Sequence, residues 1–546
     1  MLKNNLKSTS LYLVLLAVLT IPLCLGLFSD HLIDAHDSMA GLIRALSMKA
    51  YMGHGQFLVR WSPGVNWGYG YPMFNFYPPF FSFISTLFFH LTQNMVIAIN
   101  WTCILFWILS GFGMFLLARE YWGNDGGALS AVLYLYAPYH MIDLYIRGAF
   151  AEFSSFTFFP FLLLSILKMS RKPSFGAFLL GIGSVFGLSL THNIMSMLFF
   201  PVAVIYMLYL FFFENKSTWI VSASGIFGIG LMMSSFFWLP ALLEKKYLNL
   251  DFLIGKHYDF HENFITLGEL FWPLNKWSMD HISFQVGIIH SLLCLGTLIC
   301  LPKILKINKQ LGLSYIFFLS VGSLAIFLTL PYSDVLWEHI KILSFIQFPW
   351  RILTIIVFAM SFIGGSVAIL INNTLFRRTF LITAGLLVIS ISLITSLKTK
   401  FFNNEQLQNI DNFLALGEGE YVPQWVTIPP NNPPERKFEI MRGQGQLGEE
   451  KAINPVQYMV HFNAAEQSII RFHTFYFPGW KVFINENEAK IYPNIYGQIM
   501  FIVPPGEYTL RVIFGSTPVR MTGIIISWIG AALLFLSIIF AFRSKL

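Results

Sequence analysis

The stretch LYLVLLAVLTIPLCLGLF, residues 11–28, decides the class of this protein. It carries no charged side chain, and Lys3 and Lys7 lie ahead of it. A helix of about 20 apolar residues crosses the hydrocarbon core of a bilayer, and flanking lysines favour the cytosolic side. Residues 23–26 (LCLG) lack the small-residue pair at which signal peptidase cleaves. We therefore expect an uncleaved signal anchor with its N-terminus in the cytosol.

The composition of the whole chain points to the same class. Of the 546 residues, 55% are hydrophobic and 12% are charged, whereas about 25% of a soluble globular domain is charged. The high apolar content excludes a disordered protein. The formal net charge is +7, but the basic residues form no stripe, which argues against a nucleic-acid-binding protein. The chain is predicted to be a polytopic α-helical membrane protein.

Eleven further apolar runs bring the predicted number of membrane spans to about twelve. Several are shorter than the roughly 20 residues that cross a bilayer without tilt. The runs are 95–118, 127–139, 153–167, 175–190, 195–213, 219–239, 284–301, 311–330, 352–371, 379–397 and 521–542.

The charges of the connecting loops orient these spans. With the N-terminus inside, the short cytosolic loops are rich in Lys and Arg, as in residues 303–309, while the acidic residues gather outside. The apolar run 78–91 would reverse every later loop if it crossed the membrane. We therefore expect it to be a short helix at the outer interface. This orientation leaves both termini in the cytosol.

Three parts follow from this pattern. Residues 1–397 form a transmembrane domain with outer loops at 29–94, 140–152 and 241–283. Residues 398–518 alternate apolar and polar side chains between Pro/Gly turns, which predicts an extracytoplasmic β-rich domain, most simply a sandwich. Residues 519–546 form the last span and a cytosolic tail.

The first outer loop carries the residues with the clearest chemical promise. Asp34 and Asp37 follow the first span closely, so either carboxylate could act as a general base at the membrane surface. The alternative for Asp37 is a helix N-cap. Four further residues of this loop could line a substrate site, although Trp and Tyr also anchor proteins at membrane interfaces. They are His54, Trp61, Tyr69 and Tyr77.

Two arginines are candidates for binding a phosphate group. Arg147 lies in the second outer loop with Glu152, and Arg351 begins a later span. A guanidinium contacts two phosphate oxygens at once, but it can equally pair with a nearby acid or reach the lipid headgroups. His192, at the outer edge of a span, is either a substrate-binding or a structural residue.

The third outer loop allows a cation without requiring one. It contains imidazole and carboxylate groups within six positions, namely His257, Asp259, His261 and Glu262. Such groups bind divalent cations, but solvation of the loop explains them as well. No metal ligand is therefore assigned, and a divalent cation remains an open cofactor.

Nine short motifs, in this order, carry a resemblance that covers nearly the whole chain. They are WSP at 61–63, GYGYP at 68–72, FYPP at 76–79, YIRGAFAE at 145–152, LTHN at 190–193, FQVG at 284–287, FPWR at 348–351, YFPGWKV at 476–482 and VPPGEY at 503–508. The layout resembles the GT-C membrane glycosyltransferases. More closely, it resembles the bacterial 6-pyruvoyl-tetrahydropterin-synthase-related membrane proteins and the neighbouring YfhO-type proteins.

The resemblance implies transfer of a sugar from a polyprenyl-phosphate-linked donor to a glycan or lipid acceptor of the cell envelope. The reaction would take place on the outer face of the bacterial inner (cytoplasmic) membrane, among membrane lipids and without nucleic acid. The catalytic Asp of the GT-C proteins maps onto Asp37, with Asp34 as the competitor. Many relatives have a His shortly after this Asp, whereas here position 41 is Gly and the next His is His54.

Two other classes of function remain open at this point. A non-catalytic polysaccharide-assembly protein could keep the same fold, because fold does not determine activity. A lipid or polysaccharide transporter would need charged residues in the middle of its spans, and the sequence places its charges toward the ends.

Overall fold

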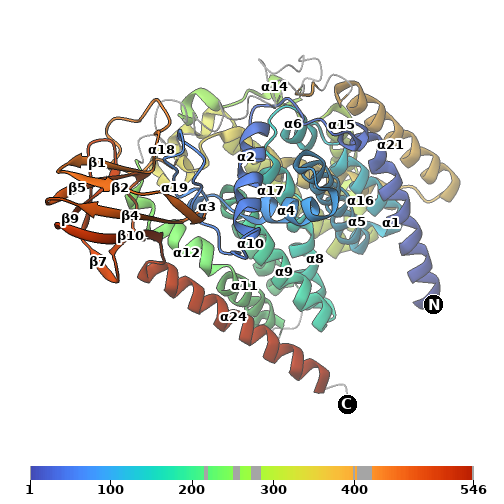
Figure 1. Ribbon diagram of the computed structural model, residues 1–546. Coiled ribbons are helices and arrows are strands. Elements are labelled where there is room, and N and C mark those ends of the chain that lie inside the picture. The colour runs from blue at the N-terminus through green and yellow to red at the C-terminus, as the bar shows by residue number, and fades with distance from the viewer. Residues whose placement is uncertain are drawn as a thin grey trace.

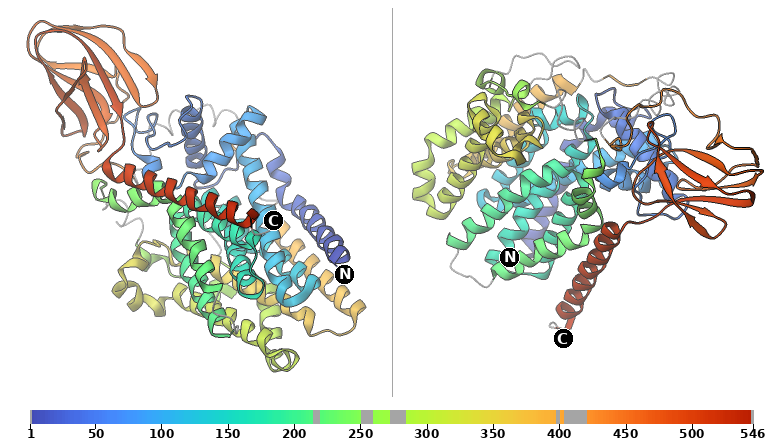
Figure 2. Two further views of the ribbon diagram at one scale, coloured as in Figure 1. Left: turned by 90° about the horizontal axis from the view of Figure 1, so that it is seen from below. Right: turned by 90° about the vertical axis from the view of Figure 1, so that its left-hand side faces the viewer.

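The computed structural model describes residues 2–213, 219–249, 259–271, 284–396, 400–402 and 421–543. A body of packed helices carries a β domain on one side, and the last helix runs back from that domain along the body (Figures 1 and 2). Both marked ends of the chain lie on the lower side in Figure 1, whereas α14 lies on the upper side. The N- and C-terminal helices therefore end on the same side of the body.

The helical body is built from α-helices and short 3-10 helices. The α-helices before residue 250 are α1 (Leu2–Cys24), α2 (Ser38–Met52), α3 (Met73–Phe76), α4 (Phe80–Thr92), α5 (Met95–Leu135), α6 (Pro138–Tyr145), α7 (Phe150–Ser155), α8 (Phe158–Arg171), α9 (Phe175–Thr191), α10 (Asn193–Phe213), α11 (Trp219–Met233) and α12 (Ser235–Leu243). The later α-helices are α14 (Leu267–Phe271), α15 (Ile288–Ile299), α16 (Leu301–Ile307), α17 (Lys309–Thr329), α18 (Asp334–His339), α19 (Lys341–Ser344), α20 (Leu353–Gly364), α21 (Thr374–Ser396) and α24 (Pro518–Arg543). The 3-10 helices are η1 (Leu25–Phe28), η2 (Lys245–Tyr247), η4 (Phe260–Asn263), η5 (Pro331–Ser333), η6 (Pro349–Ile352) and η7 (Gly365–Ile369).

The number of spans differs from the prediction of about twelve. Among the described residues, eight helices are long and apolar enough to cross a membrane, or ten if the bent pairs α11–α12 and α15–α16 each count as one. Among the described residues, a count of twelve results when both bent pairs are counted, α5 is divided at Gly123 and the shorter apolar helix α9 is added. The difference arises because bent and short helices do not reach the length of a single upright span, so they are not counted as spans on their own.

Helix α5 is a hairpin of two helices. Its 41 residues would extend for about 60 Å, twice the hydrocarbon thickness. Gly123 has φ 71° and ψ 177°, outside the helical region. After this turn the chain folds back, because Trp107 Nε1 donates a hydrogen bond of 3.1 Å to the carbonyl oxygen of Leu135. The prediction of two spans, 95–118 and 127–139, corresponds to the two arms.

The apolar run 78–91 forms α4, a helix of 13 residues. This length is too short to cross a bilayer upright. Phe81 and Phe150 stack with ring centroids 5.3 Å apart, so α4 packs onto the start of α7.

The β domain is a sandwich of two antiparallel sheets. One sheet has the order β1-β5-β9-β8, and the other has the order β2-β4-β10-β6-β7, with β3 beside β4. The strands are β1 (Phe438–Arg442), β2 (Gly445–Leu447), β3 (Lys451–Asn454), β4 (Gln457–Ala464), β5 (Ser468–Phe475), β6 (Trp480–Ile484), β7 (Asn487–Ala489), β8 (Ile491–Pro493), β9 (Gln498–Val503) and β10 (Gly506–Phe514). Phe472 of one sheet packs between Tyr458 and Trp480 of the other. Its ring centroid lies 5.3 Å from that of Tyr458 and 5.9 Å from that of Trp480. Alternating burial along the strands thus builds one apolar core.

The β domain packs against the predicted first outer loop. Trp61 is 1% exposed, and its ring lies 5.3 Å from that of Trp480 and 5.2 Å from that of Phe514. Lys437 Nζ donates to the carbonyl oxygen of Gly68 at 2.6 Å. The loop therefore forms the surface against which the β domain packs, and it also contains Asp34 and Asp37.

Candidate active site

The two loops predicted to be the first and second outer loops meet at Asp37. Its backbone N–H donates to the carbonyl oxygen of Arg147 at 2.7 Å. Gly148 makes this approach possible, because a Cβ there would lie 2.4 Å from Ser38 Oγ, and its φ of +62° suits glycine. Asp37 occupies the N-cap position of α2, but its side chain makes no capping hydrogen bond. Its carboxylate is exposed beside the second loop.

Arg147 lies at the centre of a buried charged cluster. Its Nη1 pairs with Asp143 and lies 2.9 Å from Glu152 Oε2, and both carboxylate side chains are 0% exposed. Its guanidinium stacks 4.5 Å from the ring centroid of Trp350. Burial disfavours the charged form of Arg147, but the surrounding groups, Glu152 foremost and then Tyr139, Asp143 and Asp37, together outweigh it and raise the pKa of Arg147 well above its ordinary value. The guanidinium is therefore permanently charged.

Glu152 joins the two arginines that the sequence analysis singled out. It accepts a hydrogen bond of 2.7 Å from the Tyr139 hydroxyl, and its Oε2 lies 3.4 Å from Arg351 Nε. Arg351 also donates to the carbonyl oxygen of Ile346 at 2.9 Å and to Gln347 Oε1 at 2.6 Å. With Asp143, the cluster contains two carboxylates and two guanidinium groups, so its charges balance.

All four charged groups lie at one end of the helices. Asp143 is near the end of α6, Glu152 is in the first turn of α7, and Arg351 is in η6, which precedes α20. Arg147 lies in the link between α6 and α7. Fixed positive groups at the end of a span are well placed to stabilise an anion at the membrane surface.

His192 adds a neutral imidazole to this region. It follows α9, and its Nδ1 accepts a hydrogen bond of 3.2 Å from the backbone N–H of Met195. Burial lowers the pKa of His192 to about 3, and the positive charges of Arg351 and Arg147 act in the same direction. The ring is therefore neutral at physiological pH, and its Nε2 carries the proton.

Arg44 is a further cation near this region and was not among the predicted site residues. It lies 8% exposed on α2, with its guanidinium 3.7 Å from the ring centroid of Tyr77. The seven-residue spacing from Asp37 is two helical turns, which places both residues on the same face of α2. This spacing is the sequence pattern from which Arg44 could have been predicted. No sequence pattern indicated Tyr139 or Trp350, because an aromatic residue in an apolar run is usually part of the hydrophobic core.

The remaining predicted residues lie elsewhere. Trp61 and Tyr69 pack against the β domain. The ring of Tyr69 stacks on that of Phe475 with centroids 5.7 Å apart. His54 is exposed after the end of α2. The backbone N–H of Asp34 donates to the carbonyl oxygen of Lys400 at 2.9 Å, so Asp34 lies beside the chain that leads to the β domain. His257 lies outside the described residues.

A family model described as "6-pyruvoyl-tetrahydropterin synthase related domain; membrane protein" matches residues 74–399. The match covers more than half of the chain, and the chain therefore belongs to this family of membrane proteins. An uncharacterized protein of Lactococcus lactis subsp. cremoris (strain MG1363) is 22% identical over 257 residues. The aligned part is 45% of this chain and 41% of the Lactococcus protein, so less than half of that relative is matched.

Two solved structures of membrane glycosyltransferases align with most of the chain. The mycobacterial arabinofuranosyltransferase AftD aligns with a TM-score of 0.43 and 15% identity, over 76% of this chain and 27% of AftD. The oligosaccharyltransferase of Archaeoglobus fulgidus aligns with a TM-score of 0.42 and 10% identity, over 78% of this chain and 58% of that protein. Both TM-scores lie below 0.5, so neither alignment assigns an activity to this chain.

Proposed function

We propose that this protein is a membrane glycosyltransferase that transfers a sugar from a polyprenyl-phosphate-linked donor to a cell-envelope acceptor. The observation that carries the proposal is the position of Asp37. Asp37 is exposed, and its backbone N–H donates a hydrogen bond of 2.7 Å to the carbonyl oxygen of Arg147, the centre of a buried cluster of two arginines and two acids. A general base thus lies next to a fixed positive charge at one end of the spans.

Each group then has a defined task. Asp37 takes the proton from the acceptor hydroxyl as the acceptor oxygen attacks the anomeric carbon of the donor. The bond between that carbon and the phosphate oxygen breaks, and the polyprenyl phosphate leaves as an anion. Arg351, whose side chain is 12% exposed, and Arg147 stabilise the phosphate charge. His192 and Tyr77 are proposed to contact the sugar of the donor.

The position of the charges favours an enzyme over a transporter. Asp143, Glu152 and Arg351 lie at helix ends, whereas a transporter binds its cargo near the middle of the membrane. A non-catalytic polysaccharide-assembly protein is the remaining alternative. The positive-inside pattern supports an extracytoplasmic reaction in a bacterial inner membrane, with both termini in the cytosol.

The test is replacement of Asp37 by Asn, which removes basicity and keeps the size of the side chain. We expect transfer to fall by about 10²- to 10⁴-fold, the usual contribution of a general base. Protein yield and monodispersity should not change, because the Asp37 side chain makes no capping hydrogen bond. The measurement is mass spectrometry of envelope glycans in a gene-deletion strain that expresses wild type, Asp37→Asn or Asp34→Asn.

Asp34→Asn is the matched control, since it makes the same change three residues earlier. Its transfer should stay close to wild type. If Asp34→Asn loses transfer and Asp37→Asn keeps it, the two roles are exchanged. If transfer survives in both variants, the first loop supplies no general base, and the non-catalytic alternative is favoured.

A further inference from the structure

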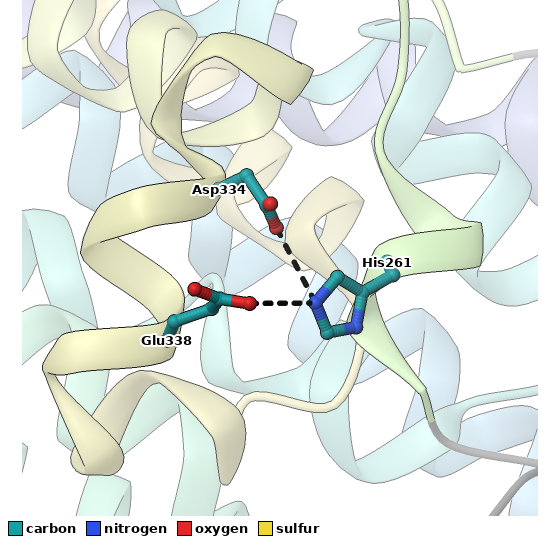
Figure 3. A group of neighbouring side chains, drawn as sticks. All are labelled: His261, Asp334 and Glu338. Atoms are coloured by element: carbon teal, nitrogen blue, oxygen red, sulfur yellow. Dashed lines mark ion pairs between the residues drawn. The ribbon is translucent and has the colours of Figure 1, made fainter.

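A second group of chemically matched side chains lies away from Asp37, where η4 faces α18. His261 of η4 points its Nε2 atom at two carboxylates of α18, Asp334 and Glu338 (Figure 3). Nε2 lies 3.6 Å from Asp334 Oδ1 and 3.6 Å from Glu338 Oε1. The three ligand atoms all lie within 4.8 Å of one another. Bonds of about 2.0–2.2 Å place two ligand atoms of a tetrahedral zinc site about 3.4 Å apart, close to both measured separations.

A fourth residue sets the tautomer of the imidazole. His261 Nδ1 lies 2.6 Å from Asp259 Oδ1, so the ring donates its Nδ1 proton to that carboxylate. In the neutral ring, the Nε2 lone pair then faces the two carboxylates of α18. A carboxylate that orients a histidine in this way is the usual support of a metal-bound imidazole.

Asp334 supplies an independent observation. Its Oδ1 atom is screened from solvent and has no hydrogen-bond partner within the described part of the chain. A screened carboxylate oxygen without a donor is costly. A cation between Asp334 and His261 would satisfy it.

Packing between η4 and α18 holds these side chains in place in the absence of an ion. Asp334 and Glu338 are four residues apart on α18, so they lie on one face of the helix. Between them, Trp337 is 1% exposed and stacks on Phe260 at 5.4 Å. This contact fixes η4 against α18, so the ligands are preorganised.

We propose that His261, Asp334 and Glu338 bind a divalent transition-metal cation, with Zn²⁺ as the representative ion and Asp259 as the positioning residue. One imidazole and two carboxylates suit zinc-like ions better than Mg²⁺ or Ca²⁺, which favour oxygen ligands alone. Three protein ligands leave one position for water. This set differs from the four residues of the loop sequence, because Asp334 and Glu338 are the carboxylate ligands and Glu262 is not among them, while His257 lies outside the described residues.

Such an ion would fasten η4 beside the charged cluster. Asn263, the last residue of η4, accepts a hydrogen bond of 3.4 Å from Trp350 Nε1. The Trp350 ring is the one that stacks on Arg147 at 4.5 Å. The proposal concerns binding alone and does not rest on the proposed glycosyl transfer.

The experiment measures Zn²⁺ binding to the full chain, purified in detergent and stripped with a chelator. Equilibrium dialysis with elemental analysis should find one Zn²⁺ per wild-type chain. His261→Gln and Glu338→Gln should lose this ion, and Asp259→Asn should bind it about 10- to 100-fold more weakly. Co²⁺ in place of Zn²⁺ should give the visible absorption of a four-coordinate site in the wild type.

His339→Gln is the matched control. His339 is the last residue of α18, but its Nδ1 pairs with the carbonyl oxygen of Val335 at 2.8 Å instead of facing the site. This variant should bind Zn²⁺ like the wild type. The proposal is overturned if the wild type binds no Zn²⁺, because a protonated His261 then bridges the carboxylates. It is equally overturned if all variants bind the ion alike.

Discussion

The buried charged cluster predicts a strong dependence of stability on charge balance. Glu152 is 0% exposed and contacts Arg147 at 2.9 Å, Arg351 at 3.4 Å and Tyr139 at 2.7 Å. Glu152→Gln keeps the shape of the side chain but leaves two guanidinium groups facing Asp143 alone. Removing one member of a buried ion pair costs about 3–5 kcal/mol, because the remaining charge is buried without compensation.

A second change should restore much of this loss. Arg351→Gln alone leaves two carboxylates with Arg147, and it should also destabilise the protein. The double variant Glu152→Gln/Arg351→Gln has one guanidinium and one carboxylate, so its charges balance again. We expect its loss of stability to be smaller than the sum of the single losses by about 1–3 kcal/mol.

The assay is the fraction of monodisperse protein that remains after heating in detergent, measured by size-exclusion chromatography for wild type and the three variants. The midpoint temperature of the double variant should lie above the value that additive losses from the two single variants predict. Strictly additive losses would refute the balanced cluster. So would a Glu152→Gln variant as stable as wild type.

Two further predictions concern topology and pH. A cysteine at the exposed Glu486 of the β domain should react with a membrane-impermeant maleimide added to intact cells, and one at the exposed Lys306 should not; the reverse pattern would contradict the orientation. The four native cysteines are buried or partly buried, which keeps the background low. Burial lowers the pKa of Lys437 from 10.5 to about 8. Between about pH 8 and pH 10.5 the unfolded chain therefore binds more protons than the folded chain. The stability of the fold should rise with pH over this range. Lys437→Met should abolish this rise, and Lys451→Met, at an exposed position, should keep it. The measurement is the midpoint temperature of thermal unfolding as a function of pH. An unchanged rise in Lys437→Met would assign the rise to other groups.

The sequence by itself determined the class of the protein and most of its secondary structure. Apolar runs free of charge must lie in lipid, because buried charge is expensive there. Alternation with a period of two can bury only one face of a strand. The β-rich pattern predicted for residues 398–518 is therefore confirmed by strands such as β4, β5 and β9. The bounds of the shortest strands, β2, β3, β7 and β8, could not be predicted, because three or four residues carry too little pattern.

Part of the candidate site could also be read from the sequence, because its members are close along the chain. Asp143, Arg147 and Glu152 lie within ten positions, and Asp37 follows the first span directly. That Arg351 would reach Glu152 was not predictable, since no local pattern relates residues so far apart. Their meeting depends on how α20 packs against α6 and α7.

Only the tertiary structure decided which side chains share a site. Trp61 and Tyr69 looked like part of a substrate wall, but they pack against the β domain, which the sequence places more than 350 residues later. His261 finds its carboxylate partners on α18, and its neighbour Glu262 is not among them. Composition and periodicity report the surroundings of each segment, whereas the partners of a side chain follow from the packing of distant helices.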